Sequence, residues 1–472
     1  MALHSYSRSY MLKAILLSFC VIFSAVTIFF GLDGSLRDWD EAVYAQVSRE
    51  NTVHSDWMNL RWNGQPWIDK PPLMIWATAI VYDLFGVGEW QARISSAVLC
   101  WLSILLVLAW GSQTGSVYTG IIGALILLGT PHFIRVGKMG QLDVPVAFFI
   151  TASLYFFYHG RKKNWCYLLS GLFTGCAVMT KWTVGLYAPI IQAVLMLFSP
   201  YRATFRSLWW WLGHLVCIAF CAPWVLYQVS HNGDLFIAHF MFAKTVAFVD
   251  SPVCGHGGPL FFYLTLMFRK SRPWVFLFFP AVGYLLWLYK RNKDENALFL
   301  SVWTIIVLGL FSVATTKLHW YIMPAYPALA LGTGYCITRV VQKEKIRSGI
   351  IAAAVCVVAG HMLFSRGYIS LDLNPEAKSL CALIRRDFPE TKEVVVFQGT
   401  SFPSIRFYSD QKVFYCVQDR KLRSFIQELE RPLLLLSAPE YDARIRSVLQ
   451  SIGQKPSVAR MVSDEYVVYN FP

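Results

Sequence analysis

The chain has 472 residues, of which 56% are hydrophobic and only 15% are charged, and its mean hydropathy is +0.45. A soluble protein of this length needs far more charge on its surface, so the composition excludes that class and indicates a membrane protein. The net charge of +14 would suggest nucleic-acid binding in a soluble protein. Basic loops held on the cytoplasmic side of a membrane explain it here, and we expect no nucleic-acid partner.

Eleven apolar runs are long enough to span a membrane. They cover residues 11–32, 92–110, 116–134, 144–160, 165–180, 183–199, 208–229, 274–290, 297–314, 321–339 and 348–364. We therefore predict about eleven transmembrane helices within residues 1–364. The first run lacks a small-residue cleavage site and is expected to be a span rather than a cleaved signal. The apolar stretch 72–87 contains Asp83 and follows two prolines, which predicts an interfacial or re-entrant helix.

Charge alternates between the loops that join these runs. With the N-terminus in the cytoplasm, the loops on that side carry a net charge of +11, whereas the rest of residues 1–364 carries +1. This asymmetry follows the positive-inside rule. It predicts a cytoplasmic N-terminus and two long external loops at residues 33–91 and 230–273.

The tail, residues 365–472, differs in composition and holds 28 of the chain's 70 charged residues. Segments 393–399 and 431–439 are typical of buried strands, whereas 379–388 and 420–430 are typical of helices. We predict a small soluble α/β domain on the external side. A disulfide between Cys381 and Cys416 is one option if that side is oxidising, and two free thiols are the other.

Acidic residues of residues 1–364 are concentrated on the predicted external side, which holds 12 of 15. Acids contribute little to topology, and long solvated loops explain only part of this skew. Asp40, Glu41 and Tyr44 follow the first apolar run, and Asp143 precedes the run at 144–160. These carboxylates are candidates for acceptor positioning or proton removal. The alternative for Asp40 is an ordinary helix N-cap.

Three lysines lie at the same predicted boundary. Lys70 precedes two prolines, Lys181 separates two apolar runs, and Lys317 lies in a very short loop. Such cations suit the phosphate headgroup of a lipid whose tail stays in the bilayer, although a lysine at an interface can also simply extend its charge to water. His256 lies in a glycine-rich loop, where it is a candidate for metal or phosphate binding.

Several motifs occur in a fixed order over about the first 340 residues: DEAVYAQVSRE (40–50), DKPPLMIWATAIVYDLFGVGEWQARISSA (69–97), LDVP (142–145), GLFTGCAVMTKWTVGL (171–186), HGGPLFFY (256–263) and TKLHWYIMPAYPALAL (316–331). This combination resembles the GT-C membrane glycosyltransferases. The resemblance is to bacterial relatives of the protein O-mannosyltransferases and of the lipid A aminoarabinose transferase.

The resemblance implies a GT-C fold, that is, an α-helical polytopic protein of the bacterial inner membrane with its tail in the periplasm. By motif, Asp40 matches the acid that begins the family's DE signature, and Glu41 and Tyr44 match its neighbours. Asp143 matches the second essential loop acid, and Lys70 matches the lysine before the double proline. The implied donor is a sugar on a polyprenyl phosphate, with Lys70, Tyr44, Lys181 and Lys317 near its phosphate.

Asp69 and His256 are similar to a metal-binding pair of the family, which implies a divalent ion as a cofactor. The chain departs from the family pattern at Val43, where an arginine is usual, and at Asp69, where a glutamate is usual.

The resulting hypothesis is an inverting glycosyltransferase, expected to be monomeric, that modifies a lipid such as lipid A or another envelope acceptor. A protein O-glycosyltransferase with the same type of donor is an alternative. Two alternatives belong to other functional classes. One is a flippase or transporter of a lipid-linked saccharide, and the other is a non-catalytic scaffold that presents the tail. A conduction path would need ionisable residues in mid-span, and the apolar runs contain almost none.

Overall fold

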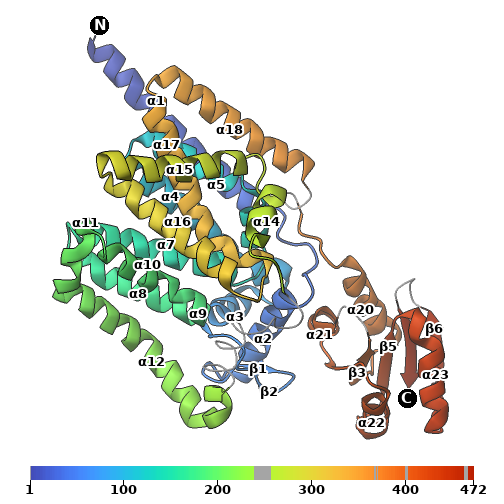
Figure 1. Ribbon diagram of the computed structural model, residues 1–472. Helices are drawn as coiled ribbons and strands as arrows, with labels where there is room; N and C mark the ends of the chain where they lie inside the picture. Colours follow the sequence, from blue (N-terminus) through green and yellow to red (C-terminus); the bar gives the residue numbers. More distant parts are fainter. Residues whose placement is uncertain (1, 239–256, 366–367, 369, 399–401, 462–465) are drawn as a thin grey trace.

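The computed structural model describes residues 2–238, 257–365, 368, 370–398, 402–461 and 466–472, and the structural statements below concern these residues. A helical part and an α/β tail make up the molecule, and the tail lies at the end far from the N-terminus (Figure 1). Helix α2, helix α3 and the hairpin β1–β2 lie at the same end as the tail.

Every predicted apolar run falls on one or more helices of the helical part. The elements are α1 (Ala2–Phe29), α2 (Asp40–His54), β1 (Arg61–Trp62), β2 (Gln65–Pro66), α3 (Leu73–Phe85), α4 (Glu89–Thr114), α5 (Val117–Leu128), α6 (Pro131–Lys138), α7 (Asp143–Gly160), α8 (Cys166–Thr180), α9 (Trp182–Gly185), α10 (Tyr187–Met196), α11 (Ser199–Arg202), η1 (Ala203–Arg206), α12 (Leu208–Phe236), α14 (Phe262–Lys270), α15 (Val275–Asn292), α16 (Glu295–Val313), η4 (His319–Ala325), α17 (Tyr326–Val340) and α18 (Glu344–Phe364).

Five helices in the described part of the chain are each long and apolar enough to cross a membrane: α1 from Met11, α4, α12, α16 and α18. Two bent pairs, α5 with α6 at 69° and the α9–α10 segment with α11–η1 at 113°, raise this number to seven. The chain is therefore a polytopic membrane protein. The remaining predicted spans coincide with α7, α8, α15 and α17, which are shorter or less apolar. Much of α7 and α17 is buried against other helices, so these helices need fewer lipid-compatible side chains.

Ion pairs join the loops that the charge pattern groups on the cytoplasmic side. Arg161 lies 2.8 Å from Glu295, Arg339 lies 3.0 Å from Asp294, and Lys13 lies 3.7 Å from Glu344. Each of the three acids predicted on this side thus pairs with a base predicted on the same side. The pairs place these loops at one end of the bundle, in agreement with the predicted grouping.

The tail contains a five-stranded sheet with the strand order β4-β3-β5-β7-β6. Strand β3 is parallel to β4 and β5, whereas β7 is antiparallel to β5 and β6. Strands β3 and β5 are buried on both faces, which explains their nearly continuous apolar sequences, whereas β4 at the edge of the sheet is partly exposed. The tail elements are α20 (Pro375–Asp387), β3 (Glu393–Phe397), α21 (Phe402–Ser409), β4 (Lys412–Cys416), α22 (Asp419–Glu428), β5 (Leu433–Ser437), η5 (Pro439–Tyr441), α23 (Asp442–Ser451), β6 (Val458–Met461) and β7 (Val467–Phe471).

Cys381 and Cys416 are both free and buried, so the structure does not contain the disulfide considered from the sequence. Cys381, on α20, packs with Val394 and Val396 on one face of the sheet. Cys416 packs with Val395 and Phe397 on the other face. Because successive residues of a strand point to opposite faces, the sheet itself separates the two thiols.

Candidate active site

The first candidate acid, Asp40, opens helix α2. Trp39 takes the N-cap position with a φ of 66° and forms no side-chain cap bond, so the alternative role of Asp40 as the N-cap is wrong. The carboxylate of Asp40 makes no hydrogen bond or ion pair with another described residue and stays partly exposed. The first turn of a helix is a favourable place for an acidic side chain, because the helix dipole is positive there.

Asp40 lines a cavity of about 490 Å³, which we call the acidic cavity. Helix α2 contributes Asp40, Val43 and Tyr44 to its wall, and the segment before α3 contributes Asp69 and Lys70. The remaining lining is apolar or aromatic: Trp39, Trp62, Pro66, Trp67, Ile68, Leu235 and Pro403. The cavity therefore combines two carboxylates and an ammonium group with apolar walls, as ligand pockets commonly do.

A short hairpin places the aromatic wall of the acidic cavity. Asn63 and Gly64 have φ values of 53° and 75°, the positive values of a two-residue type I′ turn between β1 and β2. Glu50 of α2 accepts hydrogen bonds of 3.0 Å from the backbone N–H groups of both turn residues. The turn is therefore fixed to α2, and the ring of Trp67 packs edge-on against Tyr44, with 6.1 Å between centroids.

The second candidate acid, Asp143, begins α7 and pairs with Lys181. Lys181 lies in the break between α8 and α9, and its Nζ atom is 2.6 Å from Asp143 Oδ1. The Lys181 side chain is 14% exposed and the Asp143 side chain is 6% exposed, so the pair is buried but keeps some access to solvent. The ammonium also lies 4.7 Å from the centroid of the Tyr321 ring. Loops distant in sequence thus bring one acid and one base together.

The candidate acids converge on Tyr44. Burial raises the pKa of this phenol well above its ordinary value, and Asp40, Asp143 and Asp69 each raise it further. Asp40 and Asp69 line the same cavity as this phenol. Tyr44 therefore stays protonated and can act as a hydrogen-bond donor. The structure brings together Asp40, Tyr44, Asp69, Lys70, Asp143 and Lys181, all of which the sequence singled out.

Glu41 does not face the acidic cavity, and its predicted catalytic role is not supported. It forms an ion pair with Arg93 in which both side chains are 0% exposed, with 2.7 Å between Nε and Oε1. Its carboxylate also accepts hydrogen bonds from the backbone N–H groups of Arg37 and Gly140. A Cβ on Gly140 would lie 2.7 Å from the Ala92 carbonyl oxygen, so a side chain there would disturb this contact.

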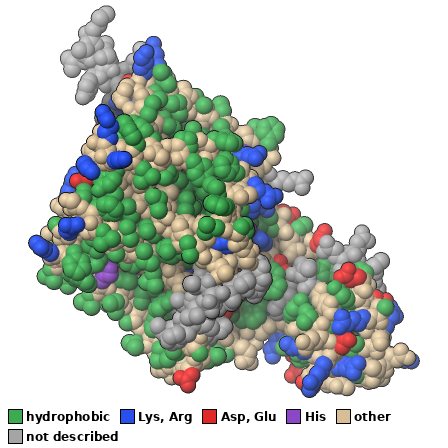
Figure 2. All heavy atoms as spheres, in the orientation of Figure 1, with side chains coloured by type: hydrophobic (Ala, Val, Ile, Leu, Met, Phe, Trp, Pro, Cys, Tyr) green, Lys and Arg blue, Asp and Glu red, His purple; other side chains and the backbone are tan. Residues whose placement is uncertain are grey.

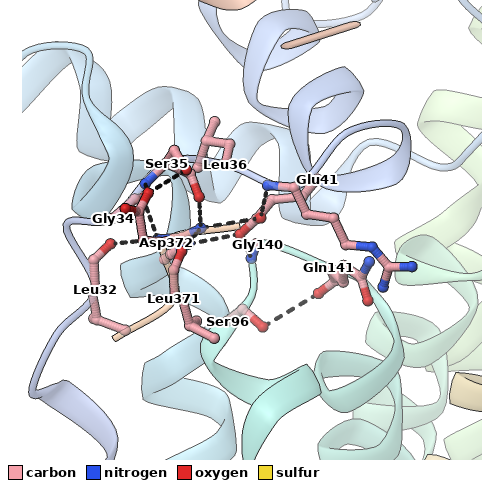
Figure 3. Close-up of polar contacts among 12 residues, drawn as sticks. Leu32, Gly34, Ser35, Leu36, Glu41, Ser96, Gly140, Gln141, Leu371 and Asp372 are labelled. Carbon is pink, nitrogen blue, oxygen red and sulfur yellow. Dashed lines mark hydrogen bonds and ion pairs between the residues drawn. The ribbon is translucent and has the colours of Figure 1, made fainter. Parts of the chain in front are cut away.

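Arg93 distributes its remaining hydrogen bonds among carbonyl groups of two segments. It donates to Leu32, Gly34, Ser35 and, in the segment that leads into the tail, Leu371. Figure 3 shows Leu32, Gly34, Ser35 and Leu371 together on one side of the contact network, with Glu41 and Gly140 toward the other side. The Glu41–Arg93 pair therefore fixes the entry to α2, and with it the position of Asp40.

Lys317 does not join the candidate site either. Its ammonium donates to the carbonyl groups of Phe311, Ser312 and Ala314 at the C-terminal end of α16, and the residue is 5% exposed. Three carbonyl acceptors use all three N–H groups of a lysine. The predicted contact of Lys317 with a donor phosphate is therefore replaced by a helix-capping role.

The predicted metal pair can be followed only in part, because His256 lies outside the described residues. Asp69 lines the acidic cavity. Within the described ranges, no group of three or more His, Cys, Asp or Glu side chains is arranged to hold a metal ion. A divalent ion at Asp69 therefore stays a prediction.

The tail completes one wall of the site, which the sequence did not predict. Ser404 of α21 donates from its backbone N–H and its hydroxyl group to Asp38, each at 2.9 Å. The neighbouring Pro403 lines the acidic cavity. Burial raises the pKa of Asp38, and the hydrogen bonds from Ser404 partly offset this. Leu36 also donates its backbone N–H to the Tyr408 hydroxyl at 2.8 Å.

Comparisons with known proteins agree with the motifs. Residues 69–227 match the family model described as dolichyl-phosphate-mannose-protein mannosyltransferase. The chain is 30% identical over 325 residues to an undecaprenyl phosphate-alpha-4-amino-4-deoxy-L-arabinose arabinosyl transferase of Sodalis glossinidius, covering 67% of this chain and 57% of the relative. The relative of the same description from Erwinia tasmaniensis is 27% identical over 359 residues, covering 70% and 64%. The matches thus span less than two thirds of these relatives.

A solved structure has the same fold over nearly the whole chain. It is ArnT from Cupriavidus metallidurans bound to undecaprenyl phosphate, which superimposes with a TM-score of 0.78 at 20% sequence identity. The alignment covers 96% of this chain and 97% of that one, tail included. The predicted GT-C fold and the resemblance to the lipid A aminoarabinose transferase family are confirmed.

Proposed function

We propose that this chain is a membrane glycosyltransferase that transfers a sugar from a polyprenyl-phosphate donor to a lipid of the lipid A type. Transfer takes place on the external face of the bacterial inner membrane, with the N-terminus in the cytoplasm. The observation that carries the proposal is the acidic cavity, where Asp40, Asp69 and Lys70 meet near the Asp143–Lys181 pair. The arabinosyl transferases among the relatives support the class of donor.

The donor phosphate binds at the cationic side of this site. Lys70 lines the acidic cavity and is close enough to Asp143 to act on its carboxylate electrostatically, as Lys181 does directly. Two ammonium groups and the protonated phenol of Tyr44 provide donors for a phosphate, and charge-assisted hydrogen bonds of this kind are the strong ones. Val43 supplies no charge where the family usually has arginine, so Lys70 and Lys181 carry this task.

The reaction is a single displacement with inversion. An acceptor oxygen forms a bond to the anomeric carbon as the bond from that carbon to the phosphate oxygen breaks, and the electron pair leaves with the polyprenyl phosphate. Lys70 and Lys181 stabilise the charge that develops on this leaving group. If the acceptor is a hydroxyl, its proton passes to Asp40. If it is an ionised phosphate oxygen, Asp40 orients the acceptor and no proton moves.

A divalent ion bound by Asp69 and His256 is a further part of the proposal. It would supply additional positive charge to the leaving phosphate. No step above depends on it, since Lys70 and Lys181 already provide two cations.

The test uses the purified chain in lipid nanodiscs with undecaprenyl phosphate that carries a radiolabelled sugar, 4-amino-4-deoxy-L-arabinose first, and lipid A as acceptor. We expect labelled lipid A with the wild type and at least a 100-fold lower rate with Asp40→Asn, the contribution typical of a general base or orienting group. Asp83→Asn, an exposed acid on α3, is the matched control and should keep the wild-type rate.

Wild-type rates for Asp40→Asn and Asp143→Asn at equal protein levels would refute the site. Covalent transfer by purified protein also separates the enzyme from a flippase, which would move the donor between leaflets without forming a new glycosidic bond. Transfer to a protein but not to a lipid would favour the protein O-glycosyltransferase alternative.

A further inference from the structure

A second cavity, of about 560 Å³, lies on the other side of the segment that leads to Asp40, and we call it the basic cavity. Its lining includes five cationic side chains from two helices, α6 and α14, and two loops: Arg37, Arg135, Arg269, Lys270 and Arg272. The imidazoles of His132, His319 and His361 also line it, whereas none of its described lining residues is Asp or Glu. Figure 2 shows Lys and Arg side chains at the edge of the helical part where α14 lies in Figure 1.

These cations are not neutralised within the described protein. None of the five has a carboxylate of a described residue within ion-pairing distance, although thirteen such pairs occur elsewhere in that part of the chain. Burial lowers the pKa of Lys270, and Arg135, Arg37 and Arg269 lower it further, which is the mark of mutual repulsion. An anion in the cavity would relieve this repulsion.

The floor of the basic cavity is fixed by a chain of hydrogen bonds. The buried His132 of α6 bonds through Nδ1 to the hydroxyl of Tyr326 at 2.9 Å and through Nε2 to Nδ1 of His319 at 3.2 Å. The Tyr326 hydroxyl also contacts Ser271 at 2.8 Å, between Lys270 and Arg272. This chain holds α6, η4 and the end of α14 together, so the cations around the cavity keep their spacing.

The basic and acidic cavities share a wall. Arg37 lines the first and Trp39 and Asp40 line the second. The guanidinium of Arg37 lies 5.0 Å from the centroid of the Trp320 ring. Trp320 stands between His319, which lines the basic cavity, and Tyr321, which lies against Lys181. Two short segments, 37–40 and 319–321, therefore separate a ligand in the basic cavity from the candidate catalytic groups.

We propose that the basic cavity binds the phosphate group of the second lipid substrate, the acceptor, while the acidic cavity holds the donor. This inference rests on the proposed function and adds the residues that recognise the acceptor. A phosphomonoester carries up to two negative charges, and arginine side chains bind it through paired N–H groups. Two anionic lipids would then lie on opposite sides of Asp40, which is the arrangement that a transfer between them requires.

The test measures binding, so that it does not depend on sugar transfer. The whole chain in phosphatidylcholine nanodiscs is titrated with dioctanoyl phosphatidic acid, with dioctanoylglycerol, which lacks the phosphate, and with inorganic phosphate. The variant is Arg269→Gln/Arg272→Gln, whose side chains are exposed. The control Lys290→Gln/Arg291→Gln removes the same charge from exposed positions at the far end of α15.

We expect the variant to bind phosphatidic acid at least tenfold more weakly than the wild type, and the control to bind it unchanged. Undecaprenyl phosphate should bind Arg269→Gln/Arg272→Gln with at least half of its wild-type affinity, and this binding also shows that the variant is folded. It should bind Lys70→Gln more weakly than the wild type. Arg135→Gln alone is a second test on a different helix and should weaken phosphatidic acid binding in the same direction.

Unchanged phosphatidic acid binding in both cavity variants, or equal binding of dioctanoylglycerol, would overturn the inference. Inorganic phosphate that binds as tightly as phosphatidic acid would overturn the assignment to a lipid. If sugar transfer proceeds in Arg269→Gln/Arg272→Gln with a wild-type KM for the acceptor, the inference fails and the proposed function stands. If phosphatidic acid binds as expected and no sugar is transferred, the proposed function fails instead.

Discussion

Two buried acid–base pairs near Asp40 have the same chemistry and different surroundings. In the Glu41–Arg93 pair, both side chains are 0% exposed and the remaining polar atoms bond to backbone groups. In the Asp143–Lys181 pair, one contact of 2.6 Å joins side chains that stay 6% and 14% exposed. A pair with all its partners can only hold structure, whereas a pair with unused donors and some access can exchange partners with a ligand.

The largest effect on stability is expected from breaking the Glu41–Arg93 pair. Arg93→Met leaves the Glu41 carboxylate buried without its partner, which costs about 3–5 kcal/mol. We expect a strongly lowered melting temperature in detergent and a low yield of folded protein, measured by thermal unfolding and size-exclusion chromatography. A variant with wild-type stability would show that the pair does not hold the entry to α2.

Breaking the Asp143–Lys181 pair is expected to lower the transfer rate more than the stability. Asp143→Asn keeps the shape of the side chain but removes the charge that faces Lys181, and we expect about a 100-fold lower kcat. The melting temperature should fall much less than in Arg93→Met, because the asparagine oxygen can still accept a hydrogen bond from Lys181. Transfer rates and thermal unfolding of the same preparation measure both. A large loss of stability with unchanged kcat would show that the Asp143–Lys181 pair has a structural role, like the Glu41–Arg93 pair.

Lys317 provides a third kind of cation, one bound only to carbonyl groups. Lys317→Met leaves three carbonyl groups of α16 without their donor, and we expect a loss of about 2 kcal/mol in stability. The KM for the polyprenyl-phosphate donor should not change. A tenfold higher KM without loss of stability would restore the donor-binding role that the sequence suggested.

The smallest effect is expected at the contact between Asp38 and the tail. Ser404→Ala removes one of the two hydrogen bonds from Ser404 to Asp38, worth about 1 kcal/mol. We expect faster cleavage of the tail by an added protease and a modest fall in kcat, because Pro403 shifts in the cavity wall. Ser451→Ala, on α23 away from this contact, should leave both unchanged.

Much of this arrangement could be predicted because it depends on local patterns. All eleven apolar runs coincide with helices, and the strands and helices expected at 393–399, 431–439, 379–388 and 420–430 are present. The sequence singled out Asp40, Tyr44, Asp69, Lys70, Asp143 and Lys181, which lie near one another in the structure. It also singled out Glu41 and Lys317, which have other partners, and His256, which lies outside the described residues. Helix length and hydrophobicity are properties of a continuous segment, so they can be read without knowledge of the partners.

The structure differs from the sequence-based expectations where the partners of a residue are distant in sequence. Glu41 stands next to Asp40, and only the fold shows that it faces Arg93, 52 positions away. Lys317 was expected to face the membrane boundary, because the sequence does not show that its ammonium reaches the carbonyl groups at the C-terminal end of α16. The basic cavity did have a signal, since residues 269–272 contain three cations and no acid. Its other half, Arg37 and Arg135, comes from two separate segments.

The bonds to the segment before the tail have a consequence for the biogenesis of the protein. Arg93, on α4, donates to the carbonyl of Leu371, and Lys138, on α6, donates to that of Tyr368. Both cations are inserted early in translation, whereas their acceptors are synthesised more than 200 residues later. Until that segment has been synthesised and has folded onto α4 and α6, the two buried cations lack some of their hydrogen-bond acceptors. The surroundings of the candidate site are thus completed only after residues 368–371 have been synthesised, so a chain that stops before them is expected to be unstable.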